Sequence, residues 1–89
     1  MVFEWDETKA AENVAKHGVR FAYAARVFDD PYRLELVDDR EDYREVRFKT
    51  IGMVDNRVLV VVYTMRHGNI RLISARQAEP YERRHYHEI

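Results

Sequence analysis

The stretch RVLVVVYTMRHGNIRLISAR, residues 57–76, decides the fold. Its first half is β-branched and apolar, and apolar residues resume after Gly68-Asn69, a pair typical of a turn. This pattern indicates two antiparallel strands joined by a two-residue turn. The strands also contain arginines, which are costly to bury without a partner or a task. The stretch therefore predicts a sheet that carries a cationic surface.

The residues before this stretch extend the sheet. Residues 43–53 alternate between polar and apolar side chains, as expected of a strand with one buried face. Asp55-Asn56 follows and suits a two-residue turn, so this strand should pair with the next one. Residues 32–37 read as a further strand, and residues 38–42 as a charged, solvated loop. Together these segments predict an antiparallel meander.

Helices are predicted before and after the meander in the chain. Asp6 can cap a helix that ends near His17, and Gly18 then stops it. A shorter helix covers residues 21–28, and a C-terminal helix opens at Pro80.

Length and pattern indicate one small domain. The chain has 89 residues, a length that buries a modest core. Residues 2–5 read as a short additional strand. We therefore expect residues 1–89 to form a single compact α+β domain, an antiparallel meander packed by two N-terminal helices and a short C-terminal helix.

Composition narrows the functional classes. There is no cysteine, so no disulfide or thiolate metal site is expected. The longest apolar run, residues 58–63, is too short to span a bilayer, and the first residues lack the pattern of a secretion signal. We therefore expect a cytoplasmic protein without membrane contact. No glycine-rich phosphate loop, nucleophile elbow or metal-binding acidic pair is present, so we expect no metal and no cofactor.

Charge is distributed unevenly along the chain. Residues 1–45 hold 7 Lys or Arg and 12 Asp or Glu, whereas residues 46–89 hold 8 and 4, so the halves carry −5 and +4. The net charge of −1 therefore conceals a basic C-terminal half, which is able to bind a polyanion. An ordinary mixed surface remains the alternative.

Turn positions predict which side chains share a face. If Asp55-Asn56 and Gly68-Asn69 are turns, Arg47 lies opposite Thr64, and Arg66 lies opposite Arg71. Alternation then places one carboxylate among four cations on one face: Glu45, Arg47, Lys49, Arg66 and Arg71. Tyr63 and Arg76 fall on the apolar face. A bulge at Gly68 would move Arg71 away from the cationic face.

A cationic face with few proton carriers suits cleavage of RNA. That reaction needs a base for the 2′-hydroxyl, cations around the phosphorane and an acid for the leaving oxygen. The candidate catalytic residues are His17, Glu45, Arg47, Arg71 and Arg76. The candidate substrate-binding residues are Lys9, Lys16, Lys49, Tyr63 and Arg66, with Tyr63 offered for base stacking.

Structural roles compete with these assignments. His17 gains from the dipole at a helix C-terminus and can serve simply as a cap. Tyr63 opposite Phe48 suits the core, and Arg76 can tie the last strand to the final helix. From the residues alone, a non-catalytic nucleic-acid-binding or partner-binding regulatory module remains open.

An ordered series of motifs runs through the chain. It comprises Phe3-Glu4-Trp5-Asp6, Lys16-His17-Gly18-Val19, the stretch Ala25…Val27-Phe28-Asp29-Asp30-Pro31, Glu45-x-Arg47, Val61-Val62-Tyr63-Thr64, Ile70-Arg71-Leu72-Ile73-Ser74-Ala75-Arg76 and Glu82-Arg83-Arg84-x-Tyr86. The series resembles the BrnT toxins of bacterial type II toxin–antitoxin systems. The resemblance implies a RelE-like fold and a metal-independent RNA endonuclease that inhibits translation. It also implies a BrnA-like ribbon-helix-helix antitoxin, a toxin–antitoxin heterotetramer, and contact with DNA only through the antitoxin.

The resemblance has departures near the C-terminus. Where the family often has a lysine and a helix-capping threonine, this chain has Gln77 and Glu79. Glutamate caps a helix poorly, although Pro80 offsets part of that by fixing φ. The departures leave Lys16, His17 and Arg71 unchanged.

Overall fold

The computed structural model describes residues 1–39 and 44–88. The predicted start of a strand at residue 43, and most of the predicted charged loop, lie outside the described residues. The elements in chain order are β1 (Phe3–Glu4), α1 (Glu7–His17), α2 (Phe21–Ala24), the 3-10 helix η1 (Ala25–Asp29), β2 (Leu34–Asp38), β3 (Arg47–Val54), β4 (Arg57–Arg66), β5 (Asn69–Gln77) and α3 (Pro80–His87).

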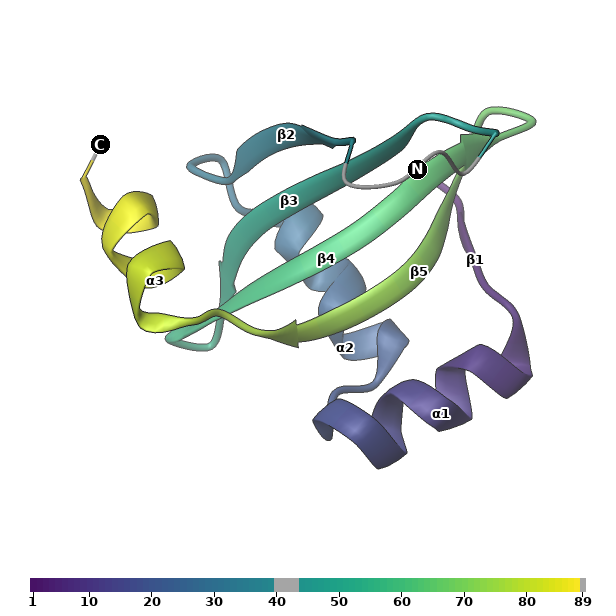
Figure 1. The fold of residues 1–89 in the computed structure, drawn as a ribbon, viewed down its shortest axis with the longest axis horizontal. Coiled ribbons are helices and arrows are strands. Elements are labelled where there is room, and N and C mark those ends of the chain that lie inside the picture. The colour runs from purple at the N-terminus through teal and green to yellow at the C-terminus, as the bar shows by residue number, and fades with distance from the viewer. Residues whose placement is uncertain (40–43, 89) are drawn as a thin grey trace.

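These elements form one five-stranded sheet with helices around it. The strand order is β1-β5-β4-β3-β2, with β1 parallel to β5 and the other pairs antiparallel. In Figure 1, α2 lies behind the sheet, α1 lies below β5, and α3 lies at the end of the sheet where β4 begins. The predicted α+β meander with two N-terminal helices and a C-terminal helix is confirmed.

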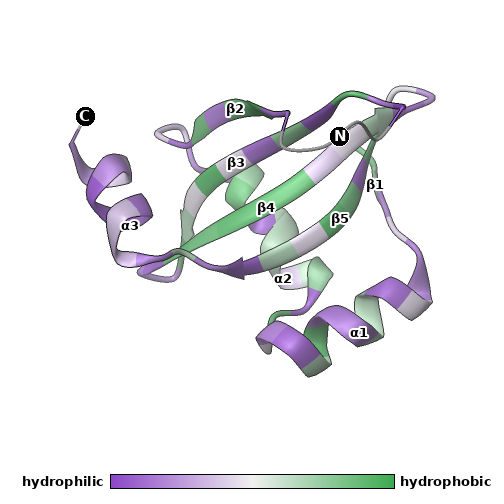
Figure 2. Cartoon of the chain, viewed as in Figure 1, coloured by the Kyte–Doolittle hydropathy of each residue, from purple (hydrophilic) through white to green (hydrophobic). Residues whose placement is uncertain are grey.

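One face of the sheet packs against α2 and η1, and we call it the helix-packed face. Its core includes Leu59, Val61 and Leu72 from the strands, with Phe21 and Val27 from the helices. All of these side chains are almost fully buried. Figure 2 shows that β4 is hydrophobic over much of its length, whereas α1 and α3 carry mainly hydrophilic residues. Burial of β4 and its neighbours therefore supplies most of the driving force for folding.

The opposite face, which we call the α3 face, is apolar only at one end. There Ile51, Val58 and Val60 pack with Ala78 and with Tyr86 of α3. Tyr86 also donates a hydrogen bond to Asp30, which anchors α3 to the end of η1. The rest of the α3 face carries charged side chains, and these form the site described below.

The two hairpin turns differ in how well the sequence predicts them. Asp55 and Asn56 form the first turn, as expected, with φ of 50° and 65°. The second turn is formed by His67 and Gly68, not by Gly68-Asn69, and both have positive φ. Arg66 consequently lies opposite Asn69 and not opposite Arg71, so that predicted pairing is wrong.

The shift in this turn leaves the predicted faces of Arg47 and Arg71 intact. Thr64 lies opposite Arg47 on β3 and opposite Arg71 on β5, so the three residues form one row across the sheet. The pairing is shifted by two residues from the predicted one, and side-chain alternation repeats every two residues.

A β-bulge further along β5 alters the face of Arg76. Tyr63 pairs with Leu72 whereas Val62 pairs with Ser74, so Ile73 is an extra residue. The bulge brings Arg76, opposite Val60, onto the α3 face. The prediction that Arg76 lies on the apolar face is therefore wrong, because alternation along β5 is interrupted once.

The backbone conformation at Gly18 makes a testable contribution to stability. Gly18 ends α1 with φ of 69°, and its N–H donates to the carbonyl oxygen of Val14. We expect Gly18→Ala to lower the free energy of unfolding by about 1 kcal/mol, because a Cβ disfavours this left-handed conformation. Gly18→Asn should lose less, since asparagine tolerates positive φ. Urea denaturation measures both, and equal losses would contradict the backbone explanation.

Candidate active site

The row formed by Arg47, Thr64 and Arg71 lies at the bottom of a shallow pocket on the α3 face. The pocket has a volume of about 160 Å³. We call it the Arg71 pocket; its lining residues are Asp6, Lys9, Glu45, Arg47, Thr64, Arg66, Arg71, Leu72 and Ile73. Four residues of the predicted cluster line this pocket, Glu45, Arg47, Arg66 and Arg71, whereas Lys49 lines another pocket. Lys9 of α1 adds a cation and Asp6 a second carboxylate.

Two carboxylates position the arginines of the Arg71 pocket. Arg71 Nη1 lies 2.8 Å from Glu4 Oε2, and Glu4 is paired with Arg71 in the β1–β5 ladder. Arg47 Nη2 lies 4.0 Å from Glu45 Oε1. Both pairs are partly exposed, so their main effect is to orient the guanidinium groups and not to stabilise the fold.

A second pocket lies further along β5 toward α3. We call it the Arg76 pocket; it has a volume of about 260 Å³ and is lined by Lys16, His17, Lys49, Val60, Val62, Ser74 and Arg76. Arg76 donates to both carboxylate oxygens of Glu82, at 2.7 and 3.0 Å. Lys49 Nζ lies 3.6 Å from the same carboxylate.

Glu82 is the most deeply buried charged group near the site. Its side chain is 2% exposed, and a buried carboxylate is costly unless it is paired and hydrogen-bonded. Burial raises the pKa of Glu82, but the Arg76 bond, the Glu79 N–H and the charge of Lys49 outweigh burial and lower it overall. The same bond raises the pKa of Arg76. Glu82 therefore holds two cations of the site in fixed positions.

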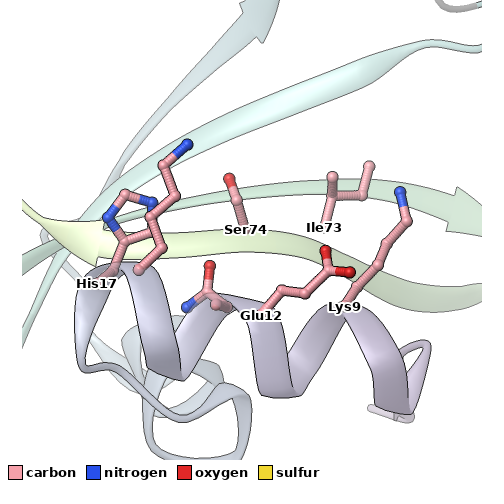
Figure 3. A pocket seen from close by; sticks show the side chains of 7 residues that line it. Lys9, Glu12, His17, Ile73 and Ser74 are labelled. Carbon is pink, nitrogen blue, oxygen red and sulfur yellow. The ribbon is translucent and has the colours of Figure 1, made fainter.

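Helix α1 joins the two pockets. A third hollow, of about 190 Å³, lies between α1 and β5 and is lined by Lys9, Glu12, Asn13, Lys16, His17, Ile73 and Ser74. Figure 3 shows the side chains of Lys9, Glu12 and His17 rising from α1 toward β5, which carries Ile73 and Ser74. This third hollow shares Lys9 and Ile73 with the Arg71 pocket, and it shares His17 and Ser74 with the Arg76 pocket. We call the three together the cationic surface.

Three cations of this surface are available to a ligand. Within residues 1–39 and 44–88, the side chains of Lys9, Lys16 and Arg66 have no hydrogen bond or ion pair. An anion bound here would therefore not have to displace an internal carboxylate from these groups.

The imidazole of His17 is suited to accept a proton. Burial lowers the pKa of His17 below its ordinary value, and the nearby charges of Lys16 and Arg76 lower it further. A larger fraction of the ring is therefore neutral near pH 7 than in an exposed histidine.

All the predicted site residues except Tyr63 line the cationic surface. Tyr63 lies in the core on the opposite face and is 8% exposed. Its ring stacks on Phe48 at 5.3 Å, and its hydroxyl donates to Glu35 at 2.8 Å. Burial, followed by this bond, raises the pKa of the Tyr63 hydroxyl. The geometry therefore contradicts a stacking role for Tyr63.

Three polar residues that organise the site, Glu4, Asn13 and Glu82, were not predicted from the sequence to have a role there. Glu4 and Glu82 belong to motifs of the quoted series, which was a usable signal. Asn13 lies between Lys9 and His17 at helical spacing. The sequence does not distinguish a buried asparagine at this position from one exposed to solvent.

No three His, Cys, Asp or Glu side chains converge as metal ligands in the described parts of the chain. None of the helices described is both long and apolar enough to cross a bilayer.

The lowered pKa of His17 is directly testable. We expect the imidazole to titrate below about 6.5 in an NMR titration, and Lys16→Gln to raise the midpoint by removing a nearby charge. The unfolded chain binds the proton more readily, so this group's contribution to stability is lost as pH falls through the window between the two pKa values. Lys9→Gln, two helical turns away, is the control. An unchanged midpoint in Lys16→Gln contradicts the electrostatic explanation.

Comparison with known proteins agrees with the chemistry of this site. The family model for the ribonuclease toxin BrnT of type II toxin–antitoxin systems matches residues 5–82. No curated protein matches the chain at a significant level. The matched segment contains every residue that lines the cationic surface, and membership of a type II system implies an antitoxin protein as partner. The chain therefore belongs to the BrnT family of ribonuclease toxins of type II toxin–antitoxin systems.

Proposed function

We propose that the protein is a metal-independent RNA endonuclease that inhibits translation in the cytoplasm by cutting RNA bound across the cationic surface. The observation that carries the proposal is the continuity of this surface, in which α1 joins the Arg71 pocket to the Arg76 pocket. Family membership supplies the class of activity, and the surface supplies a place for the substrate.

The charges of the surface fit an extended phosphodiester chain. Lys9, Lys16 and Arg66 are available for phosphate oxygens, and Arg47 and Arg71 lie in one row where a phosphate can bridge them. Guanidinium groups bind phosphate oxygens through paired hydrogen bonds.

His17 is the better of the two proton acceptors. A neutral imidazole near pH 7 combines the correct protonation state with sufficient basicity to take the 2′-hydroxyl proton. The resulting 2′-oxygen attacks phosphorus, and Arg76, which lines the same pocket as His17, stabilises the charge that develops on the phosphorane. Arg71, in the adjoining pocket, holds the RNA backbone. The leaving 5′-oxygen takes a proton from water, giving a 2′,3′-cyclic phosphate and a 5′-hydroxyl end.

Glu45 is the alternative acceptor, in the other pocket. Its carboxylate lies beside Arg47, and no pocket is lined by both Glu45 and His17. We therefore assign Glu45 to orienting Arg47. Cleavage by His17→Gln at the wild-type rate, with loss in Glu45→Gln, would reverse the two assignments.

Arg71 provides the sharpest test of the site. We expect Arg71→Ala to lower kcat/KM for RNA cleavage by about 10- to 100-fold, because a guanidinium that binds the RNA backbone is lost. The Arg71–Glu4 pair is partly exposed, so the free energy of unfolding should fall by less than about 1 kcal/mol. The assay uses end-labelled RNA with EDTA present, and growth inhibition provides a second readout.

Arg84→Ala is the matched control, because Arg84 is exposed on α3 and lines none of the three pockets. Undiminished cleavage by folded Arg71→Ala removes Arg71 from the mechanism. RNA binding without cleavage by the wild-type protein would favour the regulatory binding module. Cleavage that EDTA abolishes would contradict metal independence.

We further propose that the antitoxin is a BrnA-like ribbon-helix-helix protein. We expect co-expression to give a heterotetramer of two toxins and two antitoxins, with operator DNA bound only through the antitoxin. Native mass spectrometry measures the stoichiometry, and a mobility-shift assay compares the complex with the toxin alone. A heterodimer of one toxin and one antitoxin contradicts the heterotetramer. Specific binding of operator DNA by the toxin alone contradicts the proposal that DNA is contacted only through the antitoxin.

A further inference from the structure

The attachment of α1 to the sheet is unusual. Of the apolar residues of α1, Ala11 and Ala15 are exposed, Ala10 is only partly buried, and Val14 is 42% exposed. The buried residue of α1 is instead Asn13, at 6% exposure. A polar side chain therefore occupies the position where an apolar anchor is expected.

The Asn13 carboxamide is fully used in hydrogen bonds to backbone. Its Nδ2 donates to the carbonyl oxygen of Ala75 at 2.8 Å and to that of Val19 at 2.9 Å. Its Oδ1 accepts from the N–H of Ala75 at 3.0 Å. One side chain thus ties α1 to β5 and also to the segment that leaves α1.

This arrangement replaces a missing strand. The pairing of β1 with β5 ends at Glu4 and Arg71, so β1 does not extend alongside Ala75. Asn13 offers Ala75 one acceptor and one donor, as a neighbouring strand would. Aspartate lacks the donor, and an aliphatic residue lacks both groups. Asparagine can therefore satisfy the edge of β5 at Ala75, whereas neither aspartate nor an aliphatic residue at position 13 can do so.

The bond also fixes the two halves of the cationic surface relative to one another. Lys9, Lys16 and His17 lie four residues before, three after and four after Asn13, so they share its face of α1. Ala75 directly precedes Arg76 on β5. A shift of α1 along β5 would move all three α1 residues away from the strand cations together.

We propose that Asn13 is a positioning residue for RNA cleavage, which sets the distance between His17 and the cations of β5. The inference rests on the proposed function of the same surface. Asn13 touches neither substrate nor the reacting atoms; it acts through the placement of α1.

Asn13→Asp tests the proposal through its pH dependence. Near pH 8 the introduced carboxylate faces two carbonyl oxygens, and we expect kcat to fall at least tenfold with a smaller change in KM. At lower pH the carboxyl takes up a proton and regains a donor, so the ratio of variant to wild-type kcat should rise. The charged or titratable groups around position 13 are Lys9, Glu12, Lys16, His17 and Arg76. Wild type and variant share these groups, so a pH-dependent ratio reports the introduced carboxyl together with the shift of His17 that a displaced α1 causes.

Val58→Ala is the matched control for loss of stability. Val58 is buried in the cluster beneath α3, away from α1. We expect this variant to keep the wild-type kcat per folded molecule and a flat ratio across pH. If Asn13→Asp shows the same flat ratio and unchanged kcat, the positioning role is overturned. Should Asn13→Asp fail to fold, wild-type kcat in folded Asn13→Ser overturns the role equally.

The proposed function and the proposed positioning role fail in different ways. Absence of RNA cleavage by the wild-type protein contradicts the proposed ribonuclease function. The NMR titration of His17 in Asn13→Ser, which introduces no charge, then tests Asn13 alone, because a displaced α1 removes Arg76 from the imidazole and raises its midpoint. An unchanged midpoint contradicts the positioning role without reference to RNA.

Discussion

The extra residue Ile73 in β5 is the constraint on which the site depends. Leu72 and Ala75 are both buried in the core of the helix-packed face, yet they are three residues apart. Strict alternation would place them on opposite faces, so the strand must contain one unpaired residue between them. The same insertion turns Arg76 to the α3 face that already carries Arg71. Packing of two core residues thereby brings two arginines, five positions apart, onto one surface.

Cations that lie this close together need carboxylate partners that hold them in place and still leave hydrogen-bond donors available to a phosphate. The structure separates the two tasks: Arg71 and Arg76 are held by Glu4 and Glu82, whereas Lys9 has no such partner among the described residues. A paired guanidinium keeps donors for a phosphate and loses little rotational freedom when one binds, because its position is already fixed. An unpaired lysine contributes attraction over a longer range and adapts to the path of the chain. Preorganised charge and adaptable charge are thus present on the same surface.

Much of this fold is readable from the sequence, because its signals are local. The Asp6 cap, the Gly18 stop and the Asp55-Asn56 turn each depend on the conformational preference of one or two residues. The second turn and the bulge are not local in this sense. They are decided by which residues of β5 reach the core, and that depends on helices distant in the chain. The three-residue spacing of Leu72 and Ala75 is consistent with a bulge. The bulge can be inferred only once both residues are known to be buried on the same face of the sheet.

The joints around the site are polar, and this affects how the protein can evolve. Asn13 and Glu82 attach α1 and α3 to the sheet through directional bonds, whereas the core beneath α2 is attached by apolar contact. Apolar contacts tolerate small shifts, because their energy depends on area more than direction. Hydrogen bonds from a buried amide or carboxylate do not, since a displaced partner leaves an unsatisfied polar group. The geometry of the cationic surface is therefore set more tightly than the fold, and core substitutions that preserve volume can alter stability while leaving the cations in place.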